Sequence, residues 1–117
     1  MSEVPMDDCI FCKIAQGKIP AKRLAEDEEL LAFPDIEPQA PVHVLVIPKQ
    51  HVPSLHDVRD WSLVGRMHSL ALRVARDQGV ADSGFRVLIN TGADGVQTVG
   101  HVHLHLLGGR TMQWPPG

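Results

Sequence analysis

The sequence predicts an α+β domain in which a five-stranded antiparallel sheet carries one long and one short helix. Its 117 residues are enough for a single hydrophobic core, so we expect one domain over residues 1–117. The strand candidates are short, and one helix candidate alone is long enough to connect parallel strands. Antiparallel pairing is therefore favoured over a doubly wound parallel sheet.

Charge and hydropathy exclude several classes of protein. The 11 Lys and Arg residues are scattered and are outnumbered by 14 Asp and Glu, unlike the basic surface of a nucleic-acid binder. The longest apolar run in the middle of the chain, residues 44–47, is far shorter than the ~20 residues of a membrane span. The acidic, proline-containing start resembles no signal or transit peptide. We expect a cytoplasmic protein that binds neither nucleic acid nor membrane.

The N-terminal part is predicted to hold a short helix and two short strands. Residues 1–8 are expected to be a disordered lead. The helix spans residues 9–16 and ends at Gly17, because glycine readily adopts the left-handed conformation that follows a helix. The strands, residues 21–25 and 30–33, are joined by a polar turn.

A third strand and the long helix are predicted in the middle of the chain. Residues 42–48 alternate as a strand does, and His43 faces away from the valine side. The long helix spans residues 61–78, with Asp60 as N-cap and Gly79 beyond its end. Its apolar stripe consists of Leu63, Met67, Leu70 and Val74.

Two further strands and a tail complete the chain. The strands are residues 85–90 and 99–107, and a glycine-bearing loop over 91–98 connects them. Residues 108–117 (GGRTMQWPPG) are expected to form an extended tail, since their glycines and prolines suit neither a helix nor a long strand.

The strongest functional signal is the alternation of His101, His103 and His105. On a strand these side chains share one face, roughly 6.5 Å apart, so one tetrahedral ion could reach two of them but hardly all three. At least one imidazole is then free to act as a nucleophile or a general acid or base. The preceding glycine-bearing loop suits a phosphate, because backbone N–H groups can approach an anion there. The alternative is a half-exposed strand whose polar positions happen to be histidine.

The segment His101-Val102-His103-Leu104-His105-Leu106-Leu107 resembles the His-φ-His-φ-His-φ-φ signature of the histidine triad (HIT) superfamily, where φ is apolar. The similarity extends from residues 9–14 through 32–36 and 46–49 to the tail. The tail resembles the Hint-type branch, the nucleoside phosphoramidases, and His105 argues against the transferase branch, which has Gln there. The resemblance implies a HIT-like fold and a homodimer through which the sheet continues.

The resemblance also implies an activity and its residues. It implies a hydrolase of purine nucleoside phosphoramidates or acyl-nucleotide anhydrides, which releases a nucleoside monophosphate through a nucleotidyl-histidine. His103 would be the nucleophile, His105 would bind the phosphate, and His43 would orient the triad or relay protons. Asp35 would accept hydrogen bonds from the ribose. The full nucleotide-binding set is Ile10, Phe11, Ile14, Phe33, Asp35, Ile36, Asn90, Gln97, Thr98 and Trp114.

Several of these residues have a second interpretation, and two positions depart from the pattern. The apolar members of the nucleotide-binding set could simply be core, and His43 alone could be a satisfied core histidine. Pro34 stands where Hint-type sequences commonly have His. Val96 stands where many of them have a second glycine, which would stiffen the phosphate loop.

The two cysteines form a Cys9-x-x-Cys12 pair, a spacing typical of a metal site or a redox pair. The resemblance implies a structural zinc bound by Cys9, Cys12, His51 and His101, and no cofactor for catalysis. Such a Cys₂His₂ set completes a tetrahedral site. The alternative is two free thiols. His56 and His68 are expected at the surface.

Two other functions remain open at this point. The chain could be a nucleotide-binding regulatory module whose hydrolysis is incidental. It could instead be a zinc-dependent interaction protein, in which Cys9 matters and His103 does not.

Overall fold

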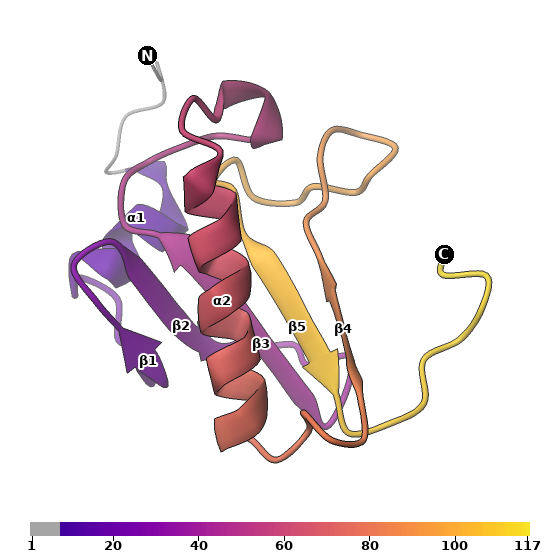
Figure 1. The fold of residues 1–117 in the computed structure, drawn as a ribbon. Coiled ribbons are helices and arrows are strands. Elements are labelled where there is room, and N and C mark those ends of the chain that lie inside the picture. The colour runs from indigo at the N-terminus through magenta and orange to yellow at the C-terminus, as the bar shows by residue number, and fades with distance from the viewer. Residues whose placement is uncertain (1–7) are drawn as a thin grey trace.

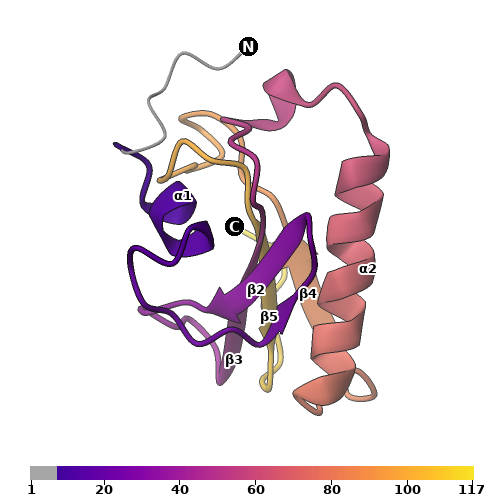
Figure 2. The ribbon, with the colours of Figure 1, turned by 90° about the vertical axis from the view of Figure 1, so that its left-hand side faces the viewer.

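The computed structural model describes residues 8–117, and it confirms the predicted α+β fold. Five strands form one antiparallel sheet in the order β1-β2-β3-β5-β4. The two α-helices cover opposite faces of this sheet (Figures 1 and 2). The disordered lead expected for residues 1–8 falls outside the described residues, except for the exposed Asp8.

Strand β3 (Val42–Pro48) occupies the middle of the sheet, as the alternating pattern predicts. It pairs with β2 (Leu30–Pro34) on one side and with β5 (Leu104–Gly108) on the other. The edges are the short β1 (Ala25–Glu26) beside β2, and β4 (Phe85–Leu88) beside β5. Because β3 is paired on both sides and covered on both faces, its side chains alternate between two separate cores.

The strand predicted over residues 21–25 is wrong in extent, since only residues 25 and 26 pair with β2. The reason lies in Arg23, whose guanidinium donates a 2.8 Å hydrogen bond to the Ile14 carbonyl. This bond ties the segment to α1 (Ile10–Ala15) before it reaches the sheet.

The last two strands are also shorter than predicted. β4 ends at Leu88 rather than at residue 90, and β5 begins at Leu104 rather than at residue 99. Immediately before β5, the Val102 N–H donates to the Val52 carbonyl at 2.7 Å, so it does not join the ladder. His101 and His103 therefore precede β5, and only His105 lies within it.

The long helix α2 (Ser62–Asp77) agrees with the prediction except at its first turn. The N-cap position belongs to Trp61, not to Asp60 as predicted, and Trp61 makes no side-chain cap bond. Asp60 nevertheless satisfies the helix start, because its carboxylate accepts hydrogen bonds from the Ser62 N–H at 3.1 Å and from the Ser62 hydroxyl at 2.6 Å. Gly79, at φ 77°, follows the C-terminus in the expected left-handed conformation.

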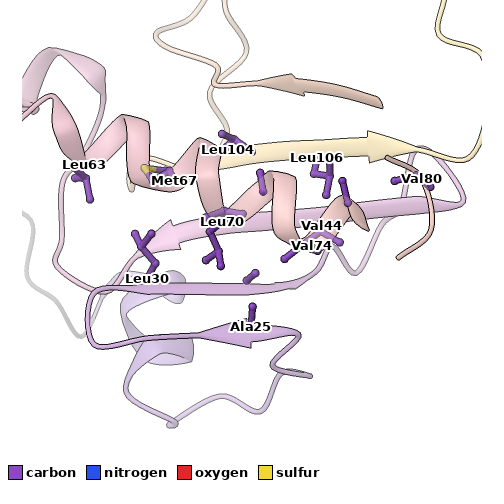
Figure 3. Packing of buried hydrophobic residues seen from close by; sticks show 14 residues of the cluster. Ala25, Leu30, Val44, Leu63, Met67, Leu70, Val74, Val80, Leu104 and Leu106 are labelled. Carbon is purple, nitrogen blue, oxygen red and sulfur yellow. The ribbon is translucent and has the colours of Figure 1, made fainter. Parts of the chain in front are cut away.

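Two hydrophobic cores lie on the two faces of the sheet. On one face the α2 stripe packs against β2, β3 and β5, with Met67 and Leu70 near Leu30 and Leu104 (Figure 3). On the other face α1 covers a second core. This second core consists of Cys9, Phe11, Cys12, Ile14, Leu31, Phe33, Leu45 and Ile47.

Within residues 8–117, neither helix has the length and apolar character required of a membrane span. A short 3-10 helix, η2 (Leu55–Asp57), lies between β3 and α2.

Candidate active site and metal cluster

The three alternating histidines share the α1 face although two of them precede the strand. The rings of His103 and His105 lie 5.0 Å apart, and the Phe11 ring meets the edges of both His101 and His103, at 5.8 and 5.1 Å. Leu104 and Leu106 point to the opposite core under α2. The predicted alternation of faces is therefore confirmed, with the irregular backbone at residues 101–103 as a correction.

His103 is held in one tautomer by its own chain. Its Nδ1–H donates a 2.7 Å hydrogen bond to the backbone carbonyl of His101. The proton of the neutral ring is therefore on Nδ1, and Nε2 keeps a free lone pair. Burial lowers the pKa of His103, with the carbonyl hydrogen bond and Asp35 opposing the shift, so the ring is neutral at pH 7. A neutral imidazole with a fixed, free nitrogen can attack an electrophile.

His43 and His105 form a hydrogen-bonded pair beside it. The backbone N–H of Gln39 donates to His43 Nδ1 at 3.0 Å, which leaves the proton of the neutral His43 ring on Nε2. That Nε2–H faces His105 Nδ1 at 2.9 Å and Asp35 Oδ2 at 3.5 Å. His105 then accepts at Nδ1 and carries its own proton on Nε2, where it can be donated to a ligand.

The charges of this pair follow from burial. Burial, and then the neighbouring His103 and His43, lower the pKa of His105 to about 4. The pKa of His43 is lowered by burial as well, while the Asp35 carboxylate opposes the shift. Both rings are therefore neutral at pH 7, as the hydrogen-bond pattern requires.

Asp35, His43 and His105 bring three potential ligand atoms within 4.8 Å of one another. A metal bound to His43 Nε2 would need a lone pair there. The Gln39 N–H already occupies the lone pair on Nδ1, so the neutral ring carries its proton on Nε2. The arrangement therefore fits a proton relay and not a metal site.

A second cluster joins Cys9, Cys12, His51 and His101, whose ligand atoms also lie within 4.8 Å of one another. The measured separations are 3.2 Å from Cys9 Sγ to His101 Nδ1, 3.3 Å from Cys12 Sγ to His51 Nδ1 and 3.6 Å from Cys12 Sγ to His101 Nδ1. A tetrahedral zinc with ordinary Zn–S and Zn–N bonds places such atoms about 3.3–3.8 Å apart. The four residues could hold a metal ion, and this donor set suits zinc.

Local structure orients the members of this metal cluster. Cys9 is the N-cap of α1, and its sulfur accepts the Cys12 N–H at 3.4 Å. His101 donates its Nε2–H to the Pro48 carbonyl at 2.8 Å, so the Nδ1 lone pair faces the sulfurs. Burial lowers the pKa of His101 to about 4 and raises that of the Cys12 thiol to about 12. A bound dication would favour the Cys12 thiolate and offset its burial.

His101 belongs to both sites. Its ring faces the cysteines, while its backbone carbonyl accepts the Nδ1–H of His103. Along the chain, one residue thus separates His101 of the metal cluster from His103. The Phe11 ring packs against the rings of both histidines.

Comparison with known proteins now places this chain. The HIT domain family model matches residues 16–112. The chain belongs to the HIT family. An uncharacterized HIT-like protein of Synechocystis is 50% identical over 113 residues, which are 95% of this chain and 98% of that protein.

Solved structures of HIT relatives share the fold. A HIT family hydrolase from Legionella pneumophila superposes with a TM-score of 0.90 at 50% identity, over 93% of this chain and 99% of that one. A histidine triad nucleotide-binding protein from Candida albicans has a TM-score of 0.79 at 35% identity, over 92% of this chain and 82% of that one.

The apolar residues expected around a base divide into two groups in this HIT protein. Phe11, Ile14 and Phe33 are 6%, 7% and 4% exposed, and the rings of Phe11 and Phe33 meet edge to face at 5.8 Å. These three are core residues. Ile10 and Ile36 are 44% and 92% exposed, so they can offer apolar surface to a ligand.

Asp35 follows β2 directly, and both its backbone N–H and its carboxylate are held by hydrogen bonds. Its N–H donates to the His43 carbonyl at 3.0 Å, and its Oδ1 accepts the Glu37 N–H at 2.8 Å. The other oxygen, Oδ2, faces His43. The carboxylate is therefore fixed beside the relay, within the same half-buried region.

The loop over residues 91–98 is held by Gln97. Its amide donates to the carbonyls of Pro53 at 2.7 Å and Val99 at 3.0 Å, so both amide hydrogens are engaged within the chain. Val96 has φ 61°, a conformation in which a β-branched residue is strained and glycine is not. The second glycine common at this position in Hint-type sequences would remove that strain.

The remaining residues of the predicted nucleotide-binding set are less buried than the phenylalanines. Asn90 is half-buried, Thr98 is exposed, and Trp114 is 82% exposed. The tail with Trp114 leaves the far end of β5 and runs past β4, away from α1 (Figure 1). The tail that carries Trp114 thus lies on the β4 side of the sheet within one chain (Figure 1).

Three contributors were missed at the sequence level. Gln39 and Pro48 act through a backbone N–H and a backbone carbonyl, which any residue with that group would supply. Thr91 has a buried hydroxyl without a hydrogen-bond partner within residues 8–117. Its place at the start of the glycine-bearing loop is the signal that could have drawn attention to it.

The relay predicts a specific pH behaviour. Because burial lowers the pKa of His105 to about 4, this ring should stay neutral well below pH 6.5, and His43, whose pKa burial also lowers, should titrate below its ordinary value. The unfolded chain takes up these protons near pH 6.5, so acid below that value should lower the free energy of unfolding. Asp35→Asn should lower both pKa values further, since the carboxylate raises them.

Ring-carbon and ring-nitrogen NMR titration of His43 and His105 checks this prediction. Glu37→Gln, which removes an exposed carboxylate two residues away, is the matched control and should leave both curves in place. A pKa for His105 at or above 6.5 in the wild-type chain would contradict it.

The metal cluster predicts that purified protein carries about one zinc per chain. Cys12→Ser should lose the metal and melt at a lower temperature, because the remaining three ligands leave the tetrahedral set incomplete. His68→Asn, at an exposed position on α2, should keep both metal and melting temperature. Elemental analysis with calorimetry measures both quantities, and a metal-free wild type that melts as the metal-loaded form does would disprove the site.

Proposed function

We propose that this HIT protein is a hydrolase of purine nucleoside phosphoramidates or acyl-nucleotide anhydrides, of the Hint-type branch. The observation that carries the proposal is the hydrogen bond from His103 Nδ1 to the His101 carbonyl, which leaves Nε2 neutral and free beside a proton relay. Relatives described as HIT family hydrolases, from Legionella pneumophila and Clostridium thermocellum, support the reaction class. The Candida albicans relative, described as nucleotide-binding, supports the substrate class.

The first step would be attack of His103 Nε2 on the α-phosphorus. A nitrogen–phosphorus bond forms, and the bond from phosphorus to the leaving amine or acyl oxygen breaks. The Nε2–H of His105 is available to a phosphoryl oxygen, because Nδ1 of the same ring accepts from His43. Charge that builds on that oxygen in the transition state would be stabilised there.

The second step would be attack of water on the nucleotidyl-histidine. The new phosphorus–oxygen bond releases the nucleoside monophosphate and returns His103 to its neutral form. A leaving amine would take one proton from solvent in the first step, and water would return one to solvent in the second. A leaving carboxylate takes up none, and the proton of water is then released to solvent. In both cases His105 and His43 end as they began. Burial lowers the pKa of both rings, so a proton that either ring takes up would be held only transiently and passed on.

The sugar would be bound by Asp35, whose Oδ2 lies at the edge of the relay. The base would meet the exposed side chains of Ile10 and Ile36, whereas Phe11 and Phe33 are buried in the core under α1. Pro34 cannot donate a hydrogen bond at this edge, so we expect the sugar contacts and the preferred base to differ from those of chains with His there.

The test of this proposal is His103→Ala. Loss of the covalent nucleophile should lower kcat by several orders of magnitude, while the affinity for nucleoside monophosphate changes much less. His105→Ala should lower kcat less than His103→Ala does, because it removes a hydrogen bond to the phosphate and not the covalent nucleophile. Rapid acid quench with labelled substrate should trap label on His103 of the wild type.

His68→Asn, on the exposed side of α2, is the control and should match the wild type. A His103→Ala variant that keeps turnover within about tenfold, which corresponds to less than about 1.4 kcal/mol, would rule out covalent catalysis by this residue. Unaltered nucleotide binding with no turnover by the wild type would favour a binding module instead.

We also propose that the chain is a homodimer in which the sheet continues through β4. Within residues 8–117, β4 pairs with β5 alone, so its other edge has unpaired N–H and C=O groups. Trp114 lies 82% exposed on the tail that passes this edge. A large aromatic side chain of this kind is typical of an interface.

Light scattering at micromolar concentration should therefore give twice the chain mass. Trp114→Ala should alter the preference among leaving groups with little change in melting temperature, since the tail would reach the partner's site. A fully active monomer at that concentration would exclude the dimer as part of the enzyme.

A further inference from the structure

The C-terminal tail, through residues 109 and 110, contacts the loop over residues 39–41 that precedes β3. The guanidinium of Arg110 donates two hydrogen bonds to the Gln39 carbonyl, from Nε at 3.2 Å and from Nη2 at 3.0 Å. Gly109, at φ 89°, lies so close to Pro41 that an added Cβ would come within 2.9 Å of the proline ring. Two successive tail residues thus hold residues 39–41 in place.

The same loop controls the tautomer of His43. The N–H of Gln39 donates to His43 Nδ1, and this bond is what leaves the proton on Nε2, opposite His105. Gln39 therefore uses its carbonyl to bind the tail and its N–H to bind the relay. Its side chain is exposed and takes no part beyond a bond to the Glu37 carbonyl at 3.0 Å.

We propose that Arg110 is a positioning residue of the histidine relay. By holding the Gln39 carbonyl, it keeps the Gln39 N–H directed at His43 Nδ1. The Nε2–H of His43 then stays opposite His105 Nδ1, and His105 presents its own Nε2–H to the phosphate. The catalytic consequence rests on the proposed function, whereas the effect on the rings does not.

The consequence of losing Arg110 follows from proton counting. Without the Gln39 N–H, neutral His43 can carry its proton on Nδ1, which turns a lone pair on Nε2 toward His105. Two lone pairs then face each other across 2.9 Å unless His105 moves its proton to Nδ1. In that form His105 Nε2 has no proton for a phosphoryl oxygen. A lysine cannot replace the arginine fully, because it lacks the planar pair of donors.

Arg86 also binds this tail and provides a matched control. Its Nη2 donates to the Gln113 carbonyl at 3.1 Å, so it also anchors the tail through a backbone oxygen. This bond holds the tail at residue 113, three residues beyond Arg110, and does not involve Gln39. Removal of either arginine should loosen the tail, but we expect a change in the tautomer of His43 for Arg110 alone.

The experiment is long-range ¹H–¹⁵N NMR of the full chain with labelled histidine, at one pH near 7 and without substrate. Wild type should show His43 protonated on Nε2 and His105 likewise. Arg110→Gln should show a mixture of tautomers at both rings, Arg110→Lys a smaller change, and Arg86→Gln the wild-type pattern. An Arg110→Gln spectrum with the wild-type pattern, or an equal change in Arg86→Gln, would overturn the proposal.

Kinetics provides the second measurement. With a phosphoramidate substrate, Arg110→Gln should lower kcat about tenfold with little change in KM. The loss is smaller than the full contribution of a general acid or base, because the histidines themselves remain. Equal kcat in Arg110→Gln and wild type, despite mixed tautomers, would overturn the positioning role. Absence of turnover by the wild type would instead refute the proposed function, and the NMR comparison would still decide whether Arg110 positions the relay.

Discussion

Three histidines of the two sites, His43, His101 and His103, are each oriented by one hydrogen bond to the backbone. His103 donates to the carbonyl of His101, His101 donates to the carbonyl of Pro48, and His43 accepts from the N–H of Gln39. A neutral imidazole has one donor and one acceptor, so fixing one nitrogen decides what the other can do. The free nitrogen of His103, the ligand nitrogen of His101 and the relay proton of His43 all follow from these three bonds.

Two of these bonds, those of His43 and of Pro48, depend in turn on the position of β3. His43 and Pro48 lie near its two ends, and β3 pairs with both β2 and β5. Its two faces are buried in separate cores, so the strand cannot shift by one residue without moving its apolar side chains to the wrong side. The register of the central strand thus fixes the distance between the relay and the metal cluster.

Burial determines the charge of the site. The pKa values of His43, His101, His103 and His105 are all lowered, with desolvation as the largest cause. Neutral rings are required for a nucleophile, for a metal ligand and for the hydrogen bonds just described. Asp35 opposes the shift at His43, His103 and His105, so within residues 8–117 it is the carboxylate that tunes the relay.

Much of the fold was accessible from the sequence, because local pattern decides it. The alternation of residues 42–48, the apolar stripe of α2 and the glycines after each helix reflect periodicity and backbone freedom, which neighbours in sequence determine. The histidine and cysteine spacings pointed to Cys9, Cys12, His101 and His105, and the family resemblance added His51, His43 and Asp35, which complete the two clusters. The ends of β1, β4 and β5 were wrong; near β1 and β5 the chain is held by the backbone carbonyls of Ile14 and Val52, which the local sequence pattern does not reveal.

Tertiary structure alone decided how those residues are used. That His103 has a free Nε2, that Gln39 sets the tautomer of His43, and that Arg110 reaches Gln39 are all consequences of backbone groups brought together by folding. Backbone groups carry no signature in a sequence, since every residue has a carbonyl and nearly every residue an N–H. The sequence by itself therefore determined which side chains could do chemistry, whereas the fold decided which nitrogen of each ring is available for it.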